Sequence, residues 1–300
     1  MIALADVDTV TAPNQPWDRA AAGWNDHTRI IRAWLHDATR MMLEAAHISA
    51  GSRVLDIAAG SGDQTLDIAR RVGENGYVLA TDISARILEL AHRNARAEGF
   101  SQIETRVADA QSLGLDGAHF DAAVSRLGLM FCDEPLVALT GACNALKPGG
   151  RFAALVFSGP HNNPCLTIMM QTALRHAGLT ADAPSPFAAG TLMSLGRPGL
   201  LVQLLNEAGF VDINVQPVIA PFRLPQSLHY IDFVRSAGSP IMQILAPLTV
   251  TEQGDAWDDM EAQLNAFGTT RGWVGPHELL LCSATAPNAP YAVSERTPLI

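Results

Sequence analysis

The chain has 300 residues, of which 48% are hydrophobic, and it carries a formal net charge of −10. This length allows an ample core, and the acidic balance argues against a nucleic-acid partner, because binding a polyanion needs clustered Lys and Arg. No stretch approaches the length of an apolar membrane span, and the first residues lack the basic start of a signal peptide. We therefore expect no integral membrane segment and a cytoplasmic location.

Residues 1–50 are predicted to form an N-terminal helical lid. Between residues 17 and 46, apolar side chains such as Ile31, Trp34 and Met42 recur near helical spacing, and Gly23 interrupts the pattern. The pattern predicts two helices ahead of the core. Their aromatic side chains either pack on a sheet or cover a ligand, and these two roles are compatible.

Residues 51–160 predict an α/β core that binds a cofactor. Short apolar strands alternate with helical segments at residues 64–71, 85–98 and 135–145, which is typical of a parallel sheet with right-handed crossovers. The first strand runs into a turn that contains Gly60 and Gly62 and opens a helix. Glycines let a ligand lie against the main chain, and a helix start offers unpaired N–H groups. The segment therefore predicts a nucleotide-binding pocket.

Acidic residues around this turn indicate which nucleotide binds. Asp56 and Asp63 flank the turn, and Asp82 ends the next apolar run, 22 residues past Gly60, where a carboxylate accepts ribose hydroxyl groups. A pyrophosphate beside Asp63 would meet like charge, whereas a sulfonium and an amino group would be favoured. Thr65 also stands near the place of the third glycine of the dinucleotide fingerprint. We therefore expect S-adenosyl-L-methionine rather than NAD.

Two further strands end at polar residues. Asp109 follows a strand at residues 103–107, at the edge where ligands of open α/β sheets bind, and its carboxylate is suited to accept from an exocyclic amine. Ser125 and Arg126 follow a strand at residues 120–124. Arg126 either anchors an anionic group of a ligand or forms a structural ion pair, and the sequence leaves both roles open.

Five segments carry a resemblance to a known family: VLDIAAGSGD (54–63), ATDIS (80–84), VADAQSL (107–113), FDAAVSRLGLMF (120–131) and LKPGGRFAALVF (146–157). In this order they resemble the motifs of class I S-adenosylmethionine-dependent methyltransferases, most of all the small-molecule branch with the ubiquinone and menaquinone C-methyltransferases. The resemblance covers roughly residues 50–160. It implies a Rossmann-like, seven-stranded, mostly parallel sheet with an antiparallel last strand, and methyl transfer to an O, C or N nucleophile of a small-molecule acceptor.

The resemblance also assigns cofactor contacts by position. Asp56 and the two glycines would hold the methionine end, and Asp82 the ribose hydroxyl groups. Ile83 would lie on an adenine face, and Asp109 with Ala110 at the adenine edge. The whole predicted cofactor set is Asp56, Ala58, Gly60, Gly62, Gln64, Asp82, Ile83, Asp109, Ala110 and Ser125. Each aspartate also has a local alternative as a turn or cap residue.

Residues 161–197 and 221–275 are predicted to be substrate cap segments, and residues 198–220 and 276–300 to be closing elements of the core. Helical patterns at 227–237, 240–248 and 252–267 are separated by Pro and Gly breaks. An insertion above the cofactor crevice is where a substrate pocket would be built. Each apolar side chain there also has ordinary core packing as an alternative.

Methyl transfer from a sulfonium needs an aligned acceptor and the exclusion of water, and a base helps when the nucleophile is a hydroxyl or an acidic carbon. His161 is the leading candidate base, because its loop leaves the carboxyl end of the strand at residues 153–157. Its alternative role is a loop histidine bonded to the backbone. Weaker candidates are His229, Tyr230, His27 and His36.

No motif has metal-ligand spacing, so no metal is predicted, and the four scattered cysteines are expected to be buried, reduced thiols. Two other functions stay open at this point. One is an NAD-linked oxidoreductase, and the other is a non-catalytic module that binds S-adenosylmethionine. The sequence also leaves open whether the chain forms a homo-oligomer.

Overall fold

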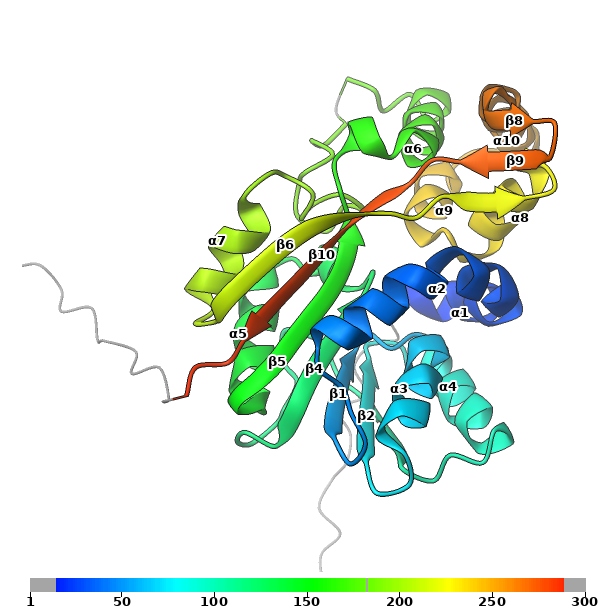
Figure 1. Ribbon diagram of the computed structural model, residues 1–300. Helices are drawn as coiled ribbons and strands as arrows, with labels where there is room; N and C mark the ends of the chain where they lie inside the picture. The colour runs from blue at the N-terminus through cyan, green and yellow to red at the C-terminus, as the bar shows by residue number, and fades with distance from the viewer. Residues whose placement is uncertain (1–14, 182, 289–300) are drawn as a thin grey trace, which may run out of the picture.

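The computed structural model describes residues 15–181 and 183–288, so residues 1–14 of the predicted lid and 289–300 of the predicted closing segment lie outside it. Its centre is a seven-stranded sheet flanked by helices (Figure 1). The strands of this sheet are β1 Arg53–Ile57, β2 Tyr77–Asp82, β3 Ile103–Val107, β4 Phe120–Arg126, β5 Leu146–Phe157, β6 Val211–Ile219 and β10 Glu278–Thr285. The α-helices are α1 Gln15–Asp26, α2 Thr28–Ala45, α3 Asp63–Val72, α4 Ala85–Ala97, α5 Pro135–Ala145, α6 Pro164–His176, α7 Leu200–Glu207, α8 Ser227–Ala237, α9 Ser239–Leu245 and α10 Val250–Leu264.

The strand order is β3-β2-β1-β4-β5-β10-β6, and β10 pairs antiparallel with both β5 and β6. The predicted fold class, with its antiparallel last strand, is confirmed. The central strands read as continuous apolar runs because helices cover both faces of the sheet. The order of the strands reverses between β1 and β4, and the crevice outside the strand ends at such a point is where open α/β sheets bind ligands.

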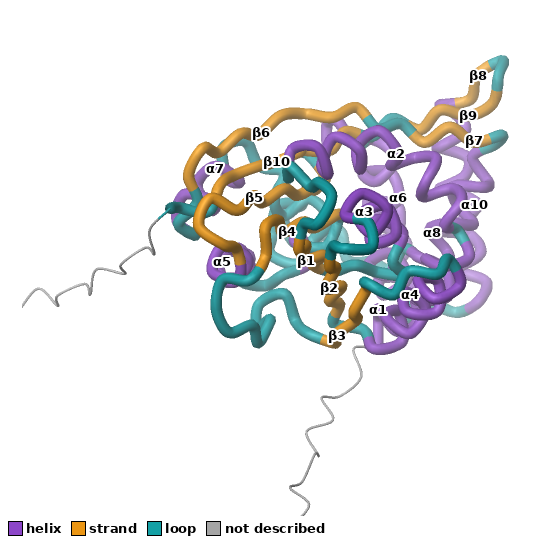
Figure 2. The backbone as a smooth tube through the Cα atoms, turned by 60° about the horizontal axis from the view of Figure 1, so that its bottom comes forward, coloured by secondary structure: helices purple, strands orange, loops and turns teal. Residues whose placement is uncertain are grey.

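A small second sheet, which the sequence patterns did not predict, joins the helices of residues 221–275 to the core. Its strands are β7 Phe222–Leu224, β9 Gly272–Gly275 and β8 Gly268–Thr269, in the order β7-β9-β8. The pair β6 and β10 runs on into the pair β7 and β9, and both figures show this ribbon reaching out from the large sheet (Figures 1 and 2). At the joint, the Ala220 N–H donates to the carbonyl of His277 over 2.9 Å.

The helices of the predicted lid and cap segments gather at one end of this ribbon. Figure 1 shows α6, α8, α9 and α10 beside the small sheet, with α1 and α2 next to them. The predicted break between the first two helices falls at His27 rather than at Gly23, which lies inside α1. Gly23 faces α8 there, because a Cβ at this position would come within 2.1 Å of the Ser236 carbonyl oxygen.

Within residues 15–181 and 183–288, no helix combines the length and the apolar character needed to cross a membrane.

Candidate functional site

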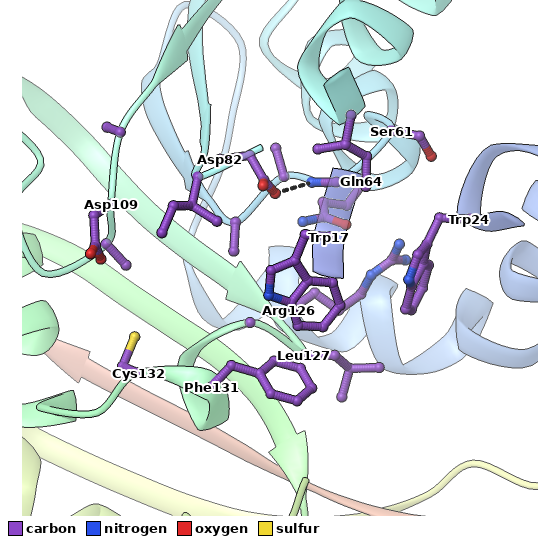
Figure 3. Close-up of a pocket in the computed structure, with 18 of the residues that line it drawn as sticks. Trp17, Trp24, Ser61, Gln64, Asp82, Asp109, Arg126, Leu127, Phe131 and Cys132 are labelled. Atoms are coloured by element: carbon purple, nitrogen blue, oxygen red, sulfur yellow. Dashed lines mark hydrogen bonds between the residues drawn. The ribbon is translucent and has the colours of Figure 1, made fainter. Parts of the chain in front are cut away.

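A pocket of about 260 Å³ opens at the carboxyl ends of β1, β2, β3 and β4, beneath α1 (Figure 3). Seven of the ten predicted cofactor residues line it: Ala58, Gly60, Gln64, Asp82, Ile83, Asp109 and Ala110. The structure therefore brings residues from three separate strand ends to one place. Side chains outside the predicted cofactor set complete the wall, notably Trp17 and Trp24 from α1 and Phe131 after β4.

The loop after β1 turns by left-handed backbone conformations. Gly60 and Gly62 have φ values of 59° and 89°, and Ala58, two residues before Gly60, has a φ of 56°. Such a conformation costs a residue with a side chain of order 1 kcal/mol or more and tends to be kept at functional sites. Gly62 does not line the pocket but packs on α4, where a Cβ would lie 3.1 Å from the Cβ of Ala91.

Asp82 ties this loop to the neighbouring strand. One carboxylate oxygen accepts from the Gly60 N–H and the other from the Ser84 N–H, both over 3.0 Å. Burial raises the pKa of Asp82, and these backbone hydrogen bonds oppose that rise. The carboxylate faces the pocket and keeps lone pairs free for a diol. Ile83, which is half exposed beside it, offers an apolar surface for a flat ring.

Asp56 lies under the pocket rather than in its wall. It is fully buried, and its two carboxylate oxygens accept from Gln64 Nε2 over 2.9 Å and from Thr65 Oγ1 over 2.6 Å. Burial raises the pKa of Asp56 to about 6 despite these hydrogen bonds. In this structure Asp56 holds the start of α3 in place, and Gln64, which it orients, is the residue that reaches the pocket wall.

Two arginines neutralise Asp63, so Asp63 is not the unpaired negative charge that the sequence predicted beside the cofactor. Asp63 accepts from Arg126 over 2.7 Å and from Arg32 over 2.9 Å, and Arg126 also donates to Thr39 over 2.8 Å. Of the two roles left open for Arg126, the structure therefore shows the ion pair. The other carboxylates in the pocket wall belong to Asp82, Asp109 and Asp133.

The remaining predicted residues occupy three different environments. Asp109 lines the pocket, where its Oδ1 also accepts from the backbone N–H of Gln111 over 2.9 Å. Ser125 is buried behind the wall, and its hydroxyl has no hydrogen-bond partner among the described residues. His161 is exposed on a 3₁₀ turn, Pro160–Asn162, and lines neither the pocket nor the chamber described next. The structure therefore does not bring the leading base candidate to the site.

A second, smaller cavity of about 70 Å³ adjoins the pocket. Trp17, Trp24, Leu127 and Phe131 line both spaces, and Trp17 meets Phe131 edge to face with ring centroids 4.7 Å apart. The rest of this apolar chamber is formed by α2, α6, α8, α9, the end of β5 and the joint of the ribbon. Its other lining residues are Trp34, Met130, Phe157, Leu166, Leu192, Phe222, Tyr230, Phe233, Val234, Ala237, Gly238, Pro240, Ile241 and His277.

Tyr230 and His277 form a buried hydrogen-bonded pair in the chamber wall, with 3.0 Å between the phenol oxygen and Nε2. Burial lowers the pKa of His277 to about 4, so its ring is neutral at pH 7. Burial and the nearby Cys165 raise the pKa of Tyr230 well above its ordinary value. Tyr230 was a weaker candidate from the sequence, but His277 was missed, since no local pattern surrounds it.

The described residues hold no group of three or more His, Cys, Asp or Glu side chains placed to bind a metal ion. All four cysteines are buried and unpaired, as the sequence predicted. Cys132 lines the cofactor pocket, and burial raises the pKa of its thiol to about 12. It is therefore an uncharged part of the wall at neutral pH.

The sheet order and a pocket at the ends of β1, β2, β3 and β4 define the class I S-adenosylmethionine-dependent methyltransferase architecture. Comparisons with known proteins agree. The model of the ubiE/COQ5 methyltransferase family matches residues 25–174, and the chain belongs to this family. The predicted resemblance and fold class are thereby confirmed.

Two relatives and one solved structure show how far the likeness extends. The chain is 38% identical over 124 residues to the ubiquinone/menaquinone biosynthesis C-methyltransferase UbiE of Azotobacter vinelandii, a match that covers 41% of this chain and 49% of that protein. It is 30% identical over 192 residues to UbiE of Shewanella pealeana, a match that covers 62% of this chain and 75% of that protein. The chain thus spans about half the length of the Azotobacter relative. Phosphoethanolamine N-methyltransferase 2 of Haemonchus contortus, solved with S-adenosyl-L-methionine, shares the fold with a TM-score of 0.55 and 16% identity. The aligned region covers 88% of this chain and 57% of that protein.

Proposed function

We propose that this protein transfers a methyl group from S-adenosyl-L-methionine to a small-molecule acceptor. The observation that supports this most is the shared wall between two unlike spaces. One is an acid-lined pocket at the strand ends, and the other is an apolar chamber, and both are bounded by Trp17, Trp24, Leu127 and Phe131. A methyl donor in the first space would face an acceptor in the second.

Within this proposal, each part of the cofactor meets a different element of the pocket. Asp82 binds the ribose hydroxyl groups, and Ile83 lies against the adenine. Asp109 and Ala110 take the adenine edge. The loop at Gly60, with Gln64, holds the methionine end, and Asp56 supports that loop from below. The resemblance to the family, together with the position of these residues in the pocket wall, supports the assignment.

The chemistry follows from the environment of the chamber. In-line attack on the methyl group converts the charged sulfonium of the donor into a neutral sulfide. A dry apolar surrounding excludes water from that step. The helices α1 and α2 act as the lid and α6, α8 and α9 as the cap that together close the chamber. The named relatives are C-methyltransferases of ubiquinone and menaquinone biosynthesis, and an apolar acceptor of that general character suits these walls.

The cofactor assignment is tested by calorimetric titration with S-adenosyl-L-methionine and, separately, with NADH. We expect binding of the first and none of the second. Asp82→Asn should weaken S-adenosyl-L-methionine binding by about tenfold to a hundredfold, because hydrogen bonds to a charged acceptor contribute roughly 1.5–3 kcal/mol. Asp258→Asn, an exposed change on α10, is the matched control and should leave the affinity unchanged. NADH binding in place of S-adenosyl-L-methionine would overturn the proposal in favour of an oxidoreductase.

Transfer itself is tested by incubating the protein and S-adenosyl-L-methionine with a panel of apolar hydroxylated acceptors. We expect S-adenosyl-L-homocysteine to accumulate with at least one of them. Cofactor binding without any turnover over the panel would support the non-catalytic alternative. His161→Ala belongs in the same assay, and its exposed position away from both spaces predicts turnover equal to that of the wild type.

A further inference from the structure

The apolar chamber carries one polar feature that neither the family match nor the cofactor assignment uses. Among the residues that line it, Tyr230 and His277 are the titratable ones, and their exposed fractions are 1% and 2%. The pair sits at the joint where the ribbon passes from the large sheet to the small one. Ligand pockets are mostly apolar with a few placed polar groups that fix the orientation of the ligand, and this pair has that character.

The direction of each hydrogen bond in the pair follows from a backbone carbonyl. His277 Nδ1 lies 3.1 Å from the carbonyl oxygen of Gly275, and a carbonyl only accepts, so Nδ1 carries the proton. In the neutral ring Nε2 is then an acceptor. Tyr230 must donate its hydroxyl proton to Nε2, which leaves only lone pairs on the phenol oxygen. The pair therefore has an acceptor, not a donor, left for a further partner.

The walls around the pair are aromatic. Trp34 stacks on Phe222 with ring centroids 4.1 Å apart, and Phe222 packs edge to face on Tyr230 with centroids 5.0 Å apart. The indole N–H of Trp34 is already used, because it donates to the carbonyl oxygen of Ala220 over 2.7 Å. Flat rings pack well against such surfaces.

We propose that the pair of Tyr230 and His277 selects the acceptor by its hydroxyl group, so that the substrate class is an apolar, phenol-like molecule that donates a hydrogen bond to the Tyr230 oxygen. This inference rests on the proposed function for the identity of the chamber as the acceptor site. A ligand with only an ether or a carbonyl at that position leaves the Tyr230 oxygen without a donor. Tyr230 is thus a specificity residue, and His277 is a positioning residue that fixes the direction of its proton.

The test compares three ligands of similar shape by calorimetry on protein saturated with S-adenosyl-L-homocysteine, which fills the cofactor pocket. p-Cresol carries a hydroxyl, p-xylene has a methyl group in its place, and 4-methylanisole has an ether oxygen that only accepts. We expect p-cresol to bind about fivefold more tightly than either of the other two ligands, because this is the gain in affinity that one neutral hydrogen bond provides. Equal affinity for p-cresol and p-xylene, or for p-cresol and 4-methylanisole, overturns the proposal.

The double variant Tyr230→Phe/His277→Leu removes both polar groups. It should bring the affinity ratio of p-cresol to p-xylene to about one, since no acceptor remains. Ile241→Val is the matched control, because it shortens an apolar wall residue of the same chamber and should weaken both ligands while keeping the ratio. A double variant that folds and keeps the wild-type ratio contradicts the proposal. If it does not fold, the three-ligand comparison on the wild type decides alone.

Failure of this inference differs from failure of the proposed function. The three ligands are titrated with and without S-adenosyl-L-homocysteine, and S-adenosyl-L-methionine is titrated separately. Normal cofactor binding with no preference for p-cresol overturns the role of the pair and leaves the cofactor assignment intact. A preference for p-cresol in a protein that binds no cofactor upholds the recognition of a hydroxyl group and overturns the proposed function.

Discussion

Asp56 and Asp82 are both aspartates at the carboxyl end of a strand, yet they have different positions in the site. Asp82 faces the pocket, while Asp56 lies beneath it and bonds to the side chains of Gln64 and Thr65. The sequence identifies both positions, because a strand that runs into a glycine turn places its last side chains at the crevice. It does not separate the ligand-facing carboxylate from the supporting one, since each requires the same residue type.

The pKa of Asp56 predicts a pH dependence of stability. Its folded-state pKa of about 6 lies above the ordinary value of 3.8, so burial penalises the charged form. The protonated Asp56 carboxyl stabilises the folded protein. This contribution is present in full below the ordinary pKa of 3.8 and is lost as the pH rises through 6. The free energy of unfolding of the wild type should fall by about 2 kcal/mol relative to that of Asp56→Asn between pH 4 and 7.

Urea unfolding of both proteins across this range measures the difference, and other carboxylates cancel in the comparison. Asp258→Asn, on the exposed face of α10, should follow the wild-type curve throughout. Parallel curves for the wild type and Asp56→Asn would show that the Asp56 carboxyl is not penalised by burial.

At the scale of elements, the longer helices were predictable and the short strands were not. The helices α5 and α8 match the predicted residues 135–145 and 227–237, and α3 and α4 differ from the prediction by one residue at an end. The helices α9 and α10 end three residues earlier than predicted. Each of α5 and α8 has a pattern of three or more turns that tertiary packing agrees with. The strands β7, β8 and β9 have only two to four residues, too few to show a period, and they form because the ribbon of β6 and β10 extends into them.

The contact between α1 and α8 gives a prediction at this scale. At Gly23 a side chain would come within 2.1 Å of the Ser236 carbonyl oxygen, so Gly23→Ala must push the two helices apart. We expect a loss of roughly 1–3 kcal/mol in the free energy of unfolding. We also expect weaker binding of S-adenosyl-L-methionine, because α1 carries Trp17 and Trp24 over the pocket.

Denaturant unfolding and calorimetric titration measure these two effects. Gly254→Ala is a matched control inside α10, where nothing lies within 4 Å of the added Cβ. It should stabilise the protein by about 0.5–1 kcal/mol, as expected for alanine in place of glycine in a helix. Wild-type stability and affinity in Gly23→Ala would show that the close approach of α1 and α8 does not hold the lid.

At the scale of the whole molecule, the cofactor half is readable from the sequence and the acceptor half is not. Apart from side chains of α1 and α2, the cofactor pocket is lined by strand ends and loops within residues 58–133, and the residues predicted for it follow from local motifs there. The chamber takes Trp34, Phe157, Phe222, Tyr230 and His277 from segments far apart in the chain. Only the folded ribbon and helices bring these residues together, which is why His161 was favoured from the sequence and His277 was not considered.

The central claim is that a methyl donor binds at Asp82 with its sulfur facing the apolar chamber. A crystal structure of the protein with S-adenosyl-L-homocysteine tests it most directly. The account predicts ribose hydroxyl groups within hydrogen-bonding distance of Asp82, adenine beside Asp109, and the sulfur directed at the wall of Trp17 and Phe131. An empty pocket at saturating ligand, or a sulfur directed away from the chamber, would contradict it.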